Sequence, residues 1–284
     1  MFMKKGLVLE GGGLRSLFSE GVFDVMLEHD VCFDGMIGVS AGASIGCNFK
    51  TKQIGRGLRY NSRFADDKRY ISLWSLLTTG DLVSKDFGYH TIPIEYDVVD
   101  EKTFEDNPME CHVVCTDVDT GEMVVKQLYK IDYDGLEWLR ASSSMPIVSR
   151  PVTLEGKRLL DGGIVNSIPL EYFQSLGYEK NVVILTQPSG YFKKKTKLMP
   201  LFHIFCHSMP KIIHAMAHRH EMYNAQLQYI ASQQSLGNTL VICPDETLPI
   251  GRVEMNPTKM QHVYDMGRRV GQANISRIIE FLNE

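Results

Sequence analysis

The sequence predicts a single α/β domain with a mainly parallel β-sheet between helices. Short apolar runs at Gly6–Glu10 and Phe33–Val39 each end at a glycine-rich turn and predict two strands. A helical pattern follows each run, over Leu14–Leu27 and Ala41–Asn48. Strand–helix–strand order of this kind gives parallel strands joined by a right-handed crossover. The compact apolar run Asn181–Thr186 adds a strand of the type buried at the centre of a sheet.

The rest of the chain predicts a mixture of helices and short strands. Residues 51–108 combine many charges with aromatic rings, so we expect helical pieces and loops there, some over the mouth of a site. Cys111–Cys115 and Glu122–Leu128 predict a hairpin, because the segment 117–121 between them is rich in turn residues. Five further elements are a helix over Tyr133–Ala141, two strands on either side of the Glu155–Gly156 turn within Val152–Leu160, a strand at Leu240–Cys243 and an amphipathic helix over Thr258–Phe281.

Length and composition are those of one globular domain over residues 1–284. No repeat, low-complexity stretch or linker interrupts the chain, and 44% of its residues are hydrophobic against 23% charged. The net charge of -4 argues against a nucleic-acid partner, which would need a basic surface. No run approaches the roughly 18 apolar residues of a spanning helix, and the first apolar run is too short for a signal peptide. We therefore expect a cytoplasmic protein.

A glycine run, Gly11–Arg15 (GGGLR), lies between the first predicted strand and the first predicted helix. Glycine lets the backbone turn tightly with its amide groups facing outward, and the helix N-terminus favours negative charge. The loop is therefore suited to a phosphate or a transient oxyanion. It approximates the dinucleotide fingerprint, which would need glycine where this chain has Ser16. A tight turn without a ligand is the alternative.

The segment Gly38–Gly42 (GVSAG) has the Gly-x-Ser-x-Gly pattern of a nucleophile elbow. In such an elbow the serine occupies a strained turn between a strand and a helix, and small residues two positions away prevent clashes. Here those residues are Gly38 and Gly42. The pattern also occurs by chance in glycine-rich loops, but the flanking strand and helix make Ser40 the candidate nucleophile.

A third segment, Asp161-Gly162-Gly163, follows the apolar pair Leu159-Leu160. An aspartate at the end of a strand, with two glycines after it, can have its carboxylate held by backbone amides beside another loop. An ordinary turn fits these residues equally well.

A serine nucleophile needs a base, which in most serine hydrolases is a histidine oriented by a carboxylate. None of the nine histidines lies in an obvious base motif. The alternative is direct proton removal by an aspartate, which is a poor base at its ordinary pKa of about 3.9 but a stronger one when burial raises that pKa. Stabilisation of the oxyanion must lower the remaining barrier, by roughly 2.7–4 kcal/mol for one well-placed donor.

Taken in this order, Gly11–Arg15, Gly38–Gly42 and Asp161–Gly163 resemble the motifs of the patatin-like phospholipase family. The resemblance also includes Ala141–Pro146 (ASSSMP), which is similar to a family segment before the catalytic aspartate. It implies a patatin-like three-layer α/β/α fold with a mainly parallel central sheet. The motif-bearing core is then about 6–170, and a C-terminal part of helices and strands follows at 171–284.

The same resemblance implies a lipase- or phospholipase-type serine esterase that cleaves acyl esters of lipids through an acyl-enzyme, with no metal and no organic cofactor. It assigns Ser40 as the nucleophile and Asp161 as the proton acceptor. The residues it implies for the oxyanion hole are Gly11, Gly12, Gly13, Leu14 and Arg15. Those it implies for support of the elbow and of the aspartate are Gly38, Gly42, Gly162 and Gly163.

The chain departs from the family pattern at Ser16, where the glycine loop usually ends in glycine. We expect the donor amides to come from Gly12, Gly13 and Leu14, so Ser16 affects the geometry of the loop more than activity. Arg15 either braces the loop or meets an anionic head group, and a structural or solvated arginine is the alternative.

Residues 191–220 combine basic, apolar and histidine-rich segments. The i, i+4 pairs His203/His207 and His214/His218 lack the further ligands of a metal site, so we expect no metal. Basic residues flank the apolar-aromatic stretch 198–205, which suits peripheral contact of 191–205 with an anionic membrane. A basic loop beside a core helix is the commoner arrangement.

Two other functions remain open from the sequence. A nucleotide-binding protein would use Gly11–Gly13 as a phosphate cradle, but this leaves Ser40 and Asp161 without a role. A catalytically silent lipid-binding or scaffold protein would keep the motifs without turnover. The expected partner is a lipid or acyl-ester substrate, and the sequence gives no indication of oligomeric state.

Overall fold

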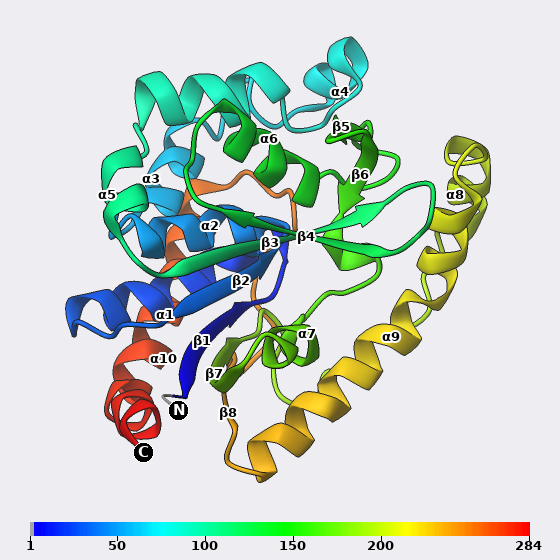
Figure 1. Cartoon of the computed structure of the whole chain (residues 1–284). Coiled ribbons are helices and arrows are strands. Elements are labelled where there is room, and N and C mark those ends of the chain that lie inside the picture. The colour runs from blue at the N-terminus through cyan, green and yellow to red at the C-terminus, as the bar shows by residue number, and fades with distance from the viewer. Residues whose placement is uncertain (1–2) are drawn as a thin grey trace.

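The computed structural model describes residues 3–284, and within this range the centre of the protein is a sheet of eight strands. Their order across the sheet is β5-β6-β3-β2-β1-β7-β8, and β4 also pairs with β3. Figure 1 shows helices on both sides of this sheet. The strands are β1 (Lys4–Leu9), β2 (Gly35–Val39), β3 (Glu110–Asp117), β4 (Met123–Leu128), β5 (Val152–Leu154), β6 (Lys157–Asp161), β7 (Tyr178–Ile184) and β8 (Thr239–Ile242).

Helices and short helical turns connect the strands. The α-helices are α1 (Ser16–Glu28), α2 (Ala41–Lys50), α3 (Arg56–Arg63), α4 (Leu73–Thr79), α5 (Glu101–Asp106), α6 (Tyr133–Ser142), α7 (Leu170–Ser175), α8 (Met199–Phe205), α9 (Pro210–Ser235) and α10 (Pro257–Asn283). The other helical segments are the 3-10 turns η1 (Gly13–Arg15) and η3 (Gly162–Ile164) and the π-helical segment η2 (Lys85–Tyr96).

The sheet is the middle layer of three. Side chains of Leu7 and Leu9 in β1 belong to the core formed with α1, α2 and α10. The intervening Val8 belongs to the core on the opposite face, formed with α7 and α9. Strands β3, β2, β1, β7 and β8 are parallel to their neighbours in that series, whereas β4, β5 and β6 join in antiparallel fashion. The predicted α/β/α fold with a mainly parallel sheet is therefore confirmed.

The predicted elements are present with shifted ends. The hairpin expected around residues 117–121 is formed by β3 and β4, and the strands around the Glu155–Gly156 turn are β5 and β6. The helix expected from Leu14 begins with the 3-10 turn η1, and α1 itself starts at Ser16. The segment 51–108 consists of α3, α4, η2 and α5 with connecting loops.

One edge of β3 determines where the candidate functional loops meet. Strand β4 pairs with β3 from Cys111 to Thr116 and so occupies one edge of β3 over this length. Strands β2 and β6 must therefore share the other edge, one after the other. Val39 of β2 pairs with Val114, and Asp161 of β6 pairs with the next residue, Cys115. The carboxyl ends of β2 and β6 thus meet end to end.

Candidate active site

Ser40 lies in the sharp turn between β2 and α2. Its backbone has φ +57° and ψ −133°, a left-handed conformation that costs a non-glycine residue on the order of 1–3 kcal/mol and needs support from its surroundings. The Ser40 carbonyl accepts hydrogen bonds from Ala43 (2.9 Å) and Ser44 (3.2 Å). The flanking glycines are needed for space, because a Cβ on Gly38 would lie 2.5 Å from Ala43 Cα and one on Gly42 would lie 2.7 Å from the Glu10 carbonyl oxygen.

Ser142 holds this turn against β3. The Ser40 amide donates to Ser142 Oγ at 2.9 Å, and the Ser142 hydroxyl donates to the Val114 carbonyl at 2.6 Å. The backbone of the strained residue is therefore fixed by a side chain from the end of α6. Sequence reasoning gave Ser142 no role of its own, although it lies within the ASSSMP segment that carried part of the resemblance.

Asp161 is the last residue of β6 and only 2% exposed. Its Oδ1 accepts the Gly163 amide at 2.7 Å, and its backbone carbonyl accepts the Thr116 hydroxyl at 2.8 Å. Among residues 3–284, the second oxygen, Oδ2, is buried and has no hydrogen-bond partner. A buried carboxylate with one free oxygen can accept a proton.

Burial raises the pKa of Asp161, and four groups oppose the effect: the Ser40 hydroxyl, Arg219, the Gly163 amide and Arg252. The Ser40 side chain is thus close enough to stabilise the carboxylate. No well-formed hydrogen bond joins the two groups in the described part of the chain, since Oδ2 remains without a donor. Contacts of this kind are often long before substrate binds and shorten in the reacting complex.

The glycine loop passes directly beside Ser40. A Cβ on Gly11 would lie 2.9 Å from the Ser40 Cβ, so only glycine allows this approach. Within the loop the Leu14 amide donates to the Arg252 carbonyl at 3.0 Å, and the Arg15 amide donates to the Gly12 carbonyl at 3.4 Å. The Leu14 amide, which the sequence suggested as an oxyanion donor, is therefore already engaged.

The amides of Gly12 and Gly13 have no acceptor among the described residues. Gly13 has a positive φ of +58°, and a Cβ there would lie 2.2 Å from the Arg252 carbonyl oxygen. Arg15 braces the loop through a hydrogen bond from Nε to the Gly12 carbonyl at 3.3 Å. Ser16, which replaces the usual glycine, starts α1 with a buried hydroxyl that finds no partner within residues 3–284.

Glu10 anchors the start of the loop and was not singled out from the sequence. Its buried carboxylate accepts the Thr186 amide at 2.6 Å, the Thr186 hydroxyl at 3.1 Å and the Tyr223 hydroxyl at 2.6 Å. These bonds tie the loop to the end of β7 and to α9. A glutamate directly after an apolar strand was the available signal, but its partners lie more than 170 residues away in the sequence.

The histidine pairs do not form a metal site with other residues. In the range 3–284, no group of three or more His, Cys, Asp or Glu side chains is arranged to hold a metal ion. The rings of His214 and His218 lie 4.4 Å apart on α9, and His218 Nδ1 is hydrogen-bonded to the His214 carbonyl at 3.0 Å. Within the same range, no helix has the length and apolar character needed to cross a bilayer.

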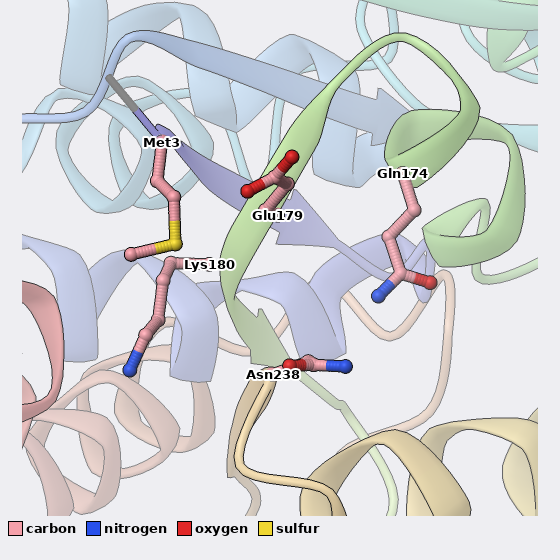
Figure 2. Close-up of a pocket in the computed structure, with 5 residues that line it drawn as sticks. All are labelled: Met3, Gln174, Glu179, Lys180 and Asn238. Atoms are coloured by element: carbon pink, nitrogen blue, oxygen red, sulfur yellow. The ribbon is translucent and has the colours of Figure 1, made fainter. Parts of the chain in front are cut away.

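The cavity in Figure 2 lies away from Ser40. It has a volume of about 250 Å³ and is lined by Met3, Gln174, Glu179, Lys180 and Asn238. Met3 precedes β1 and Asn238 precedes β8, so the cavity lies at the amino ends of the parallel strands. The elbow and the glycine loop lie at the carboxyl ends, where α/β proteins place their ligands.

Two family models match this chain. A model described as patatin-like phospholipase matches residues 7–173, which is more than half of the chain. A model described as a domain of unknown function, DUF6363, matches residues 209–283.

Similar proteins fall into two groups. The uncharacterized protein YjjU of Escherichia coli strain K12 is 24% identical over 98% of this chain and 79% of its own length. Lysophospholipase NTE1 of Meyerozyma guilliermondii is 29% identical over 61% of this chain, and that of Saccharomyces cerevisiae is 28% identical over 61%. This chain spans only 12% and 10% of the length of these two lysophospholipases. Among solved structures, VipD from Legionella pneumophila has a TM-score of 0.43 at 13% identity over 96% of this chain and 67% of its own, a likeness too low to carry an argument.

Proposed function

Because the chain belongs to the patatin-like phospholipase family, we propose that it is a serine hydrolase that cleaves acyl esters of lipids. The observation that carries the proposal is the buried carboxyl group of Asp161, which has one oxygen without a partner among residues 3–284 and whose pKa is lowered by the side chain of the strained Ser40. The names of the similar lysophospholipases support a lipid ester as substrate.

In this reaction Ser40 Oγ attacks the acyl carbonyl while Asp161 Oδ2 takes the hydroxyl proton. The carbonyl oxygen becomes an oxyanion that accepts hydrogen bonds from the amides of Gly12 and Gly13. Protonated Asp161 then gives its proton to the leaving alcohol, and the acyl group remains on Ser40. Asp161 next takes a proton from water as the water attacks the acyl-enzyme, and returns it to Ser40 as the fatty acid leaves.

Two physical features make aspartate workable as the base. Burial raises the pKa of Asp161, which makes the carboxylate a better proton acceptor than an exposed one. The free amides of the glycine loop contribute to oxyanion stabilisation, at roughly 2.7–4 kcal/mol for one well-placed donor. No histidine is required in this mechanism.

We also propose that the protein meets its substrate at an anionic membrane surface through α8 and the segment before it. Ile204 and Phe205 of α8 are 63% and 60% exposed, and the preceding segment carries the exposed lysines 194, 195 and 197. Helix α4 exposes Leu73, Trp74 and Leu77 in the same way. Both helices lie toward the upper right of Figure 1. Apolar side chains beside lysines match an interface with anionic lipids.

Hydrolysis of a panel of acyl esters by three variants tests the catalytic assignment. We expect Ser40→Ala and Asp161→Asn to lose nearly all turnover with little change in thermal stability, because each removes one partner of the proton transfer. Ser44→Ala, one turn further along α2, is the matched control and should retain turnover. Near wild-type activity in either of the first two variants would refute the dyad. A folded wild-type protein that hydrolyses no ester would instead favour a silent lipid-binding protein.

A further inference from the structure

Four cationic residues lie at or near the glycine loop and the Asp161 turn. They are Arg15 in η1, Lys193 in the segment before α8, Arg219 in α9 and Arg252 in the loop before α10. We call these four residues the basic cluster. Three of its members come from the part of the chain beyond the patatin-like match at residues 7–173.

Arg219 and Arg252 contact the two loops that flank Ser40. Arg219 Nε donates to the Gly163 carbonyl, and its Nη2 donates to Ser167 Oγ at 3.1 Å. Arg252 packs its backbone against the glycine loop, where its carbonyl accepts the Leu14 amide at 3.0 Å. Its side chain is exposed. Arg219 therefore contacts the Asp161 turn, and Arg252 contacts the glycine loop.

Lys193 lies against Tyr223, whose hydroxyl is bonded to the residue before the glycine loop. Its Nζ lies 4.3 Å from the centre of the Tyr223 ring. The Tyr223 hydroxyl donates to Glu10, the residue directly before the glycine loop, at 2.6 Å. Mutual hydrogen bonds between the Lys193 backbone and the Asn224 side chain, at 2.9 and 3.0 Å, fix this segment on α9.

The basic cluster has no paired carboxylate. Within residues 3–284, none of its four side chains comes within the 4.0 Å that defines an ion pair with Asp or Glu. Glu10 and Asp161 are the carboxyl groups that act on it from nearby. The three arginines alone outnumber these two carboxyl groups, which leaves an excess of positive charge.

The cations also repel one another. Burial and then Arg219 and Arg252 lower the pKa of Lys193 to about 7. Burial and then Arg252 lower the pKa of both Arg219 and Arg15. Arg15, Lys193 and Arg219 are half-buried, and half-buried cations without a paired carboxylate are costly. An anionic ligand among them would relieve both the desolvation and the repulsion.

We propose that the basic cluster binds a phosphomonoester on the alcohol part of the substrate and so selects acyl esters of phosphorylated alcohols. This inference rests on the proposed hydrolase function. A phosphomonoester carries up to two negative charges and several acceptor oxygens, which suits arginine and lysine donors converging from separate segments. Because Arg15 and Arg219 hydrogen-bond to the two loops beside Ser40, we expect a phosphate held by the basic cluster to lie near an ester held at Ser40, as the two groups do within a glycerol phosphate ester.

The competing explanation is that the basic cluster only adjusts Asp161, since Arg219 and Arg252 lower the pKa of that residue. That role would change the pH profile of every ester equally. Selection of a phosphate would instead change the ratio between two substrates that differ only in the phosphate. The two explanations therefore separate in one set of measurements.

The test compares 1-lauroyl lysophosphatidate with 1-lauroylglycerol as substrates of wild type, Lys193→Met and Arg252→Met. In the described part of the chain the two side chains make no hydrogen bond to protein, so their removal leaves both loops supported. We expect wild type to prefer the phosphate ester by at least about tenfold in kcat/KM. Each variant should lower this ratio about tenfold (about 1.4 kcal/mol), mainly through KM. Arg269→Met, an exposed arginine of α10, should leave it unchanged.

Inhibition distinguishes a free phosphate from a head group. Inorganic phosphate and glycerol 3-phosphate are each tested against 1-lauroylglycerol hydrolysis, and we expect glycerol 3-phosphate to compete and to weaken in both variants. Competition by inorganic phosphate alone would mean a free-anion site and would overturn the head-group assignment. A wild-type kcat/KM ratio near one between the two substrates would also overturn the head-group assignment. So would equal losses of kcat/KM on both substrates in the variants together with a shifted pH profile. Either result would still leave ester hydrolysis established. If wild type hydrolyses neither ester, the proposed function fails. The anion site is then tested separately by calorimetry, in which glycerol 3-phosphate should bind Ser40→Ala and bind Lys193→Met more weakly.

Discussion

Ser40 is held by backbone contacts to its neighbours rather than by its own side chain. The Ser142 hydroxyl accepts a hydrogen bond from the Ser40 amide and donates one to a carbonyl of β3. Gly11, Gly38 and Gly42 leave the space that the turn needs. The Gly-x-Ser-x-Gly pattern was visible in the sequence because the elbow is local. Ser142 could not be assigned from the sequence, since its contact with Ser40 spans 102 positions.

Gly13→Ala tests the proposed oxyanion role of the glycine loop at the scale of one residue. Gly13 has a φ of +58°, and the new Cβ would lie 2.2 Å from the Arg252 carbonyl oxygen. The loop must therefore move, and its amides no longer point toward the oxyanion. We expect kcat to fall about a hundredfold or more, as for the loss of one oxyanion donor. The control is Gly237→Ala, which has a similar φ of +78° and no atom within 4 Å of the new Cβ. Equal kcat values for the two variants would contradict a catalytic role for the loop.

At the scale of elements, the meeting of β2 and β6 on one edge of β3 brings Asp161 to Ser40. The sequence predicted the hairpin of β3 and β4 and the strands around Gly156, because turn residues and apolar runs are local signals. It did not predict that β6 would pair antiparallel with β3 beyond the end of β2. Such a pairing depends on long-range contacts, which sequence spacing does not reveal. The assignment of Ser40 and Asp161 as a dyad therefore came from the resemblance to the patatin-like family.

The contact between α1 and α3 is a second feature of this scale. Glu20 of α1 accepts the amides of Gly57 and Leu58 at the start of α3, at 2.5 and 2.8 Å, where a helix favours negative charge. Burial, followed by repulsion from Asp24, nevertheless raises the pKa of Glu20 to about 8. The group therefore favours the protonated form in the folded state.

Glu20→Gln is predicted to lower the free energy of unfolding by about 1–3 kcal/mol, because its amide NH₂ would face backbone donors. Wild-type Glu20 has a pKa of about 8 when folded and about 4.3 when unfolded, so its contribution to stability falls as pH rises between these values. Glutamine does not titrate. The loss measured by urea unfolding should therefore be larger at pH 5 than at pH 8. The exposed Glu246→Gln is the control, and a pH-independent difference for Glu20→Gln would count against this account.

At the scale of the whole molecule, the two matched segments of the chain build one sheet and one candidate site. Strand β8 extends the sheet beside β7. Both Arg219 and Arg252 lie within the segment matched at residues 209–283. We propose that residues 1–284 form one domain on this basis. The C-terminal contribution to the site could not be predicted from the sequence, because isolated arginines and lysines have no local motif.

We expect the exposed apolar side chains of α8 to contribute to membrane binding. Burial of an isoleucine side chain contributes about 1.5–3 kcal/mol, so Ile204→Asp should weaken binding to phosphatidylserine-containing vesicles at least about tenfold in a sedimentation assay. Leu236→Asp removes a leucine that is 68% exposed just beyond the C-terminus of α9 and serves as control. Equal binding by the two variants, or equal binding of wild type to phosphatidylcholine vesicles, would exclude contact through α8 with an anionic surface.

Mapping a covalent fluorophosphonate adduct tests the dyad most directly. Such a reagent reacts with an activated serine in place of the acyl ester, and peptide mass spectrometry identifies the modified residue. We expect one adduct, on Ser40, that is absent in Ser40→Ala. It should form at least about tenfold more slowly in Asp161→Asn, where Ser40 is intact but lacks its proton acceptor. An adduct on another residue, or an undiminished rate in Asp161→Asn, would contradict the assignment of Ser40 and Asp161 as nucleophile and base.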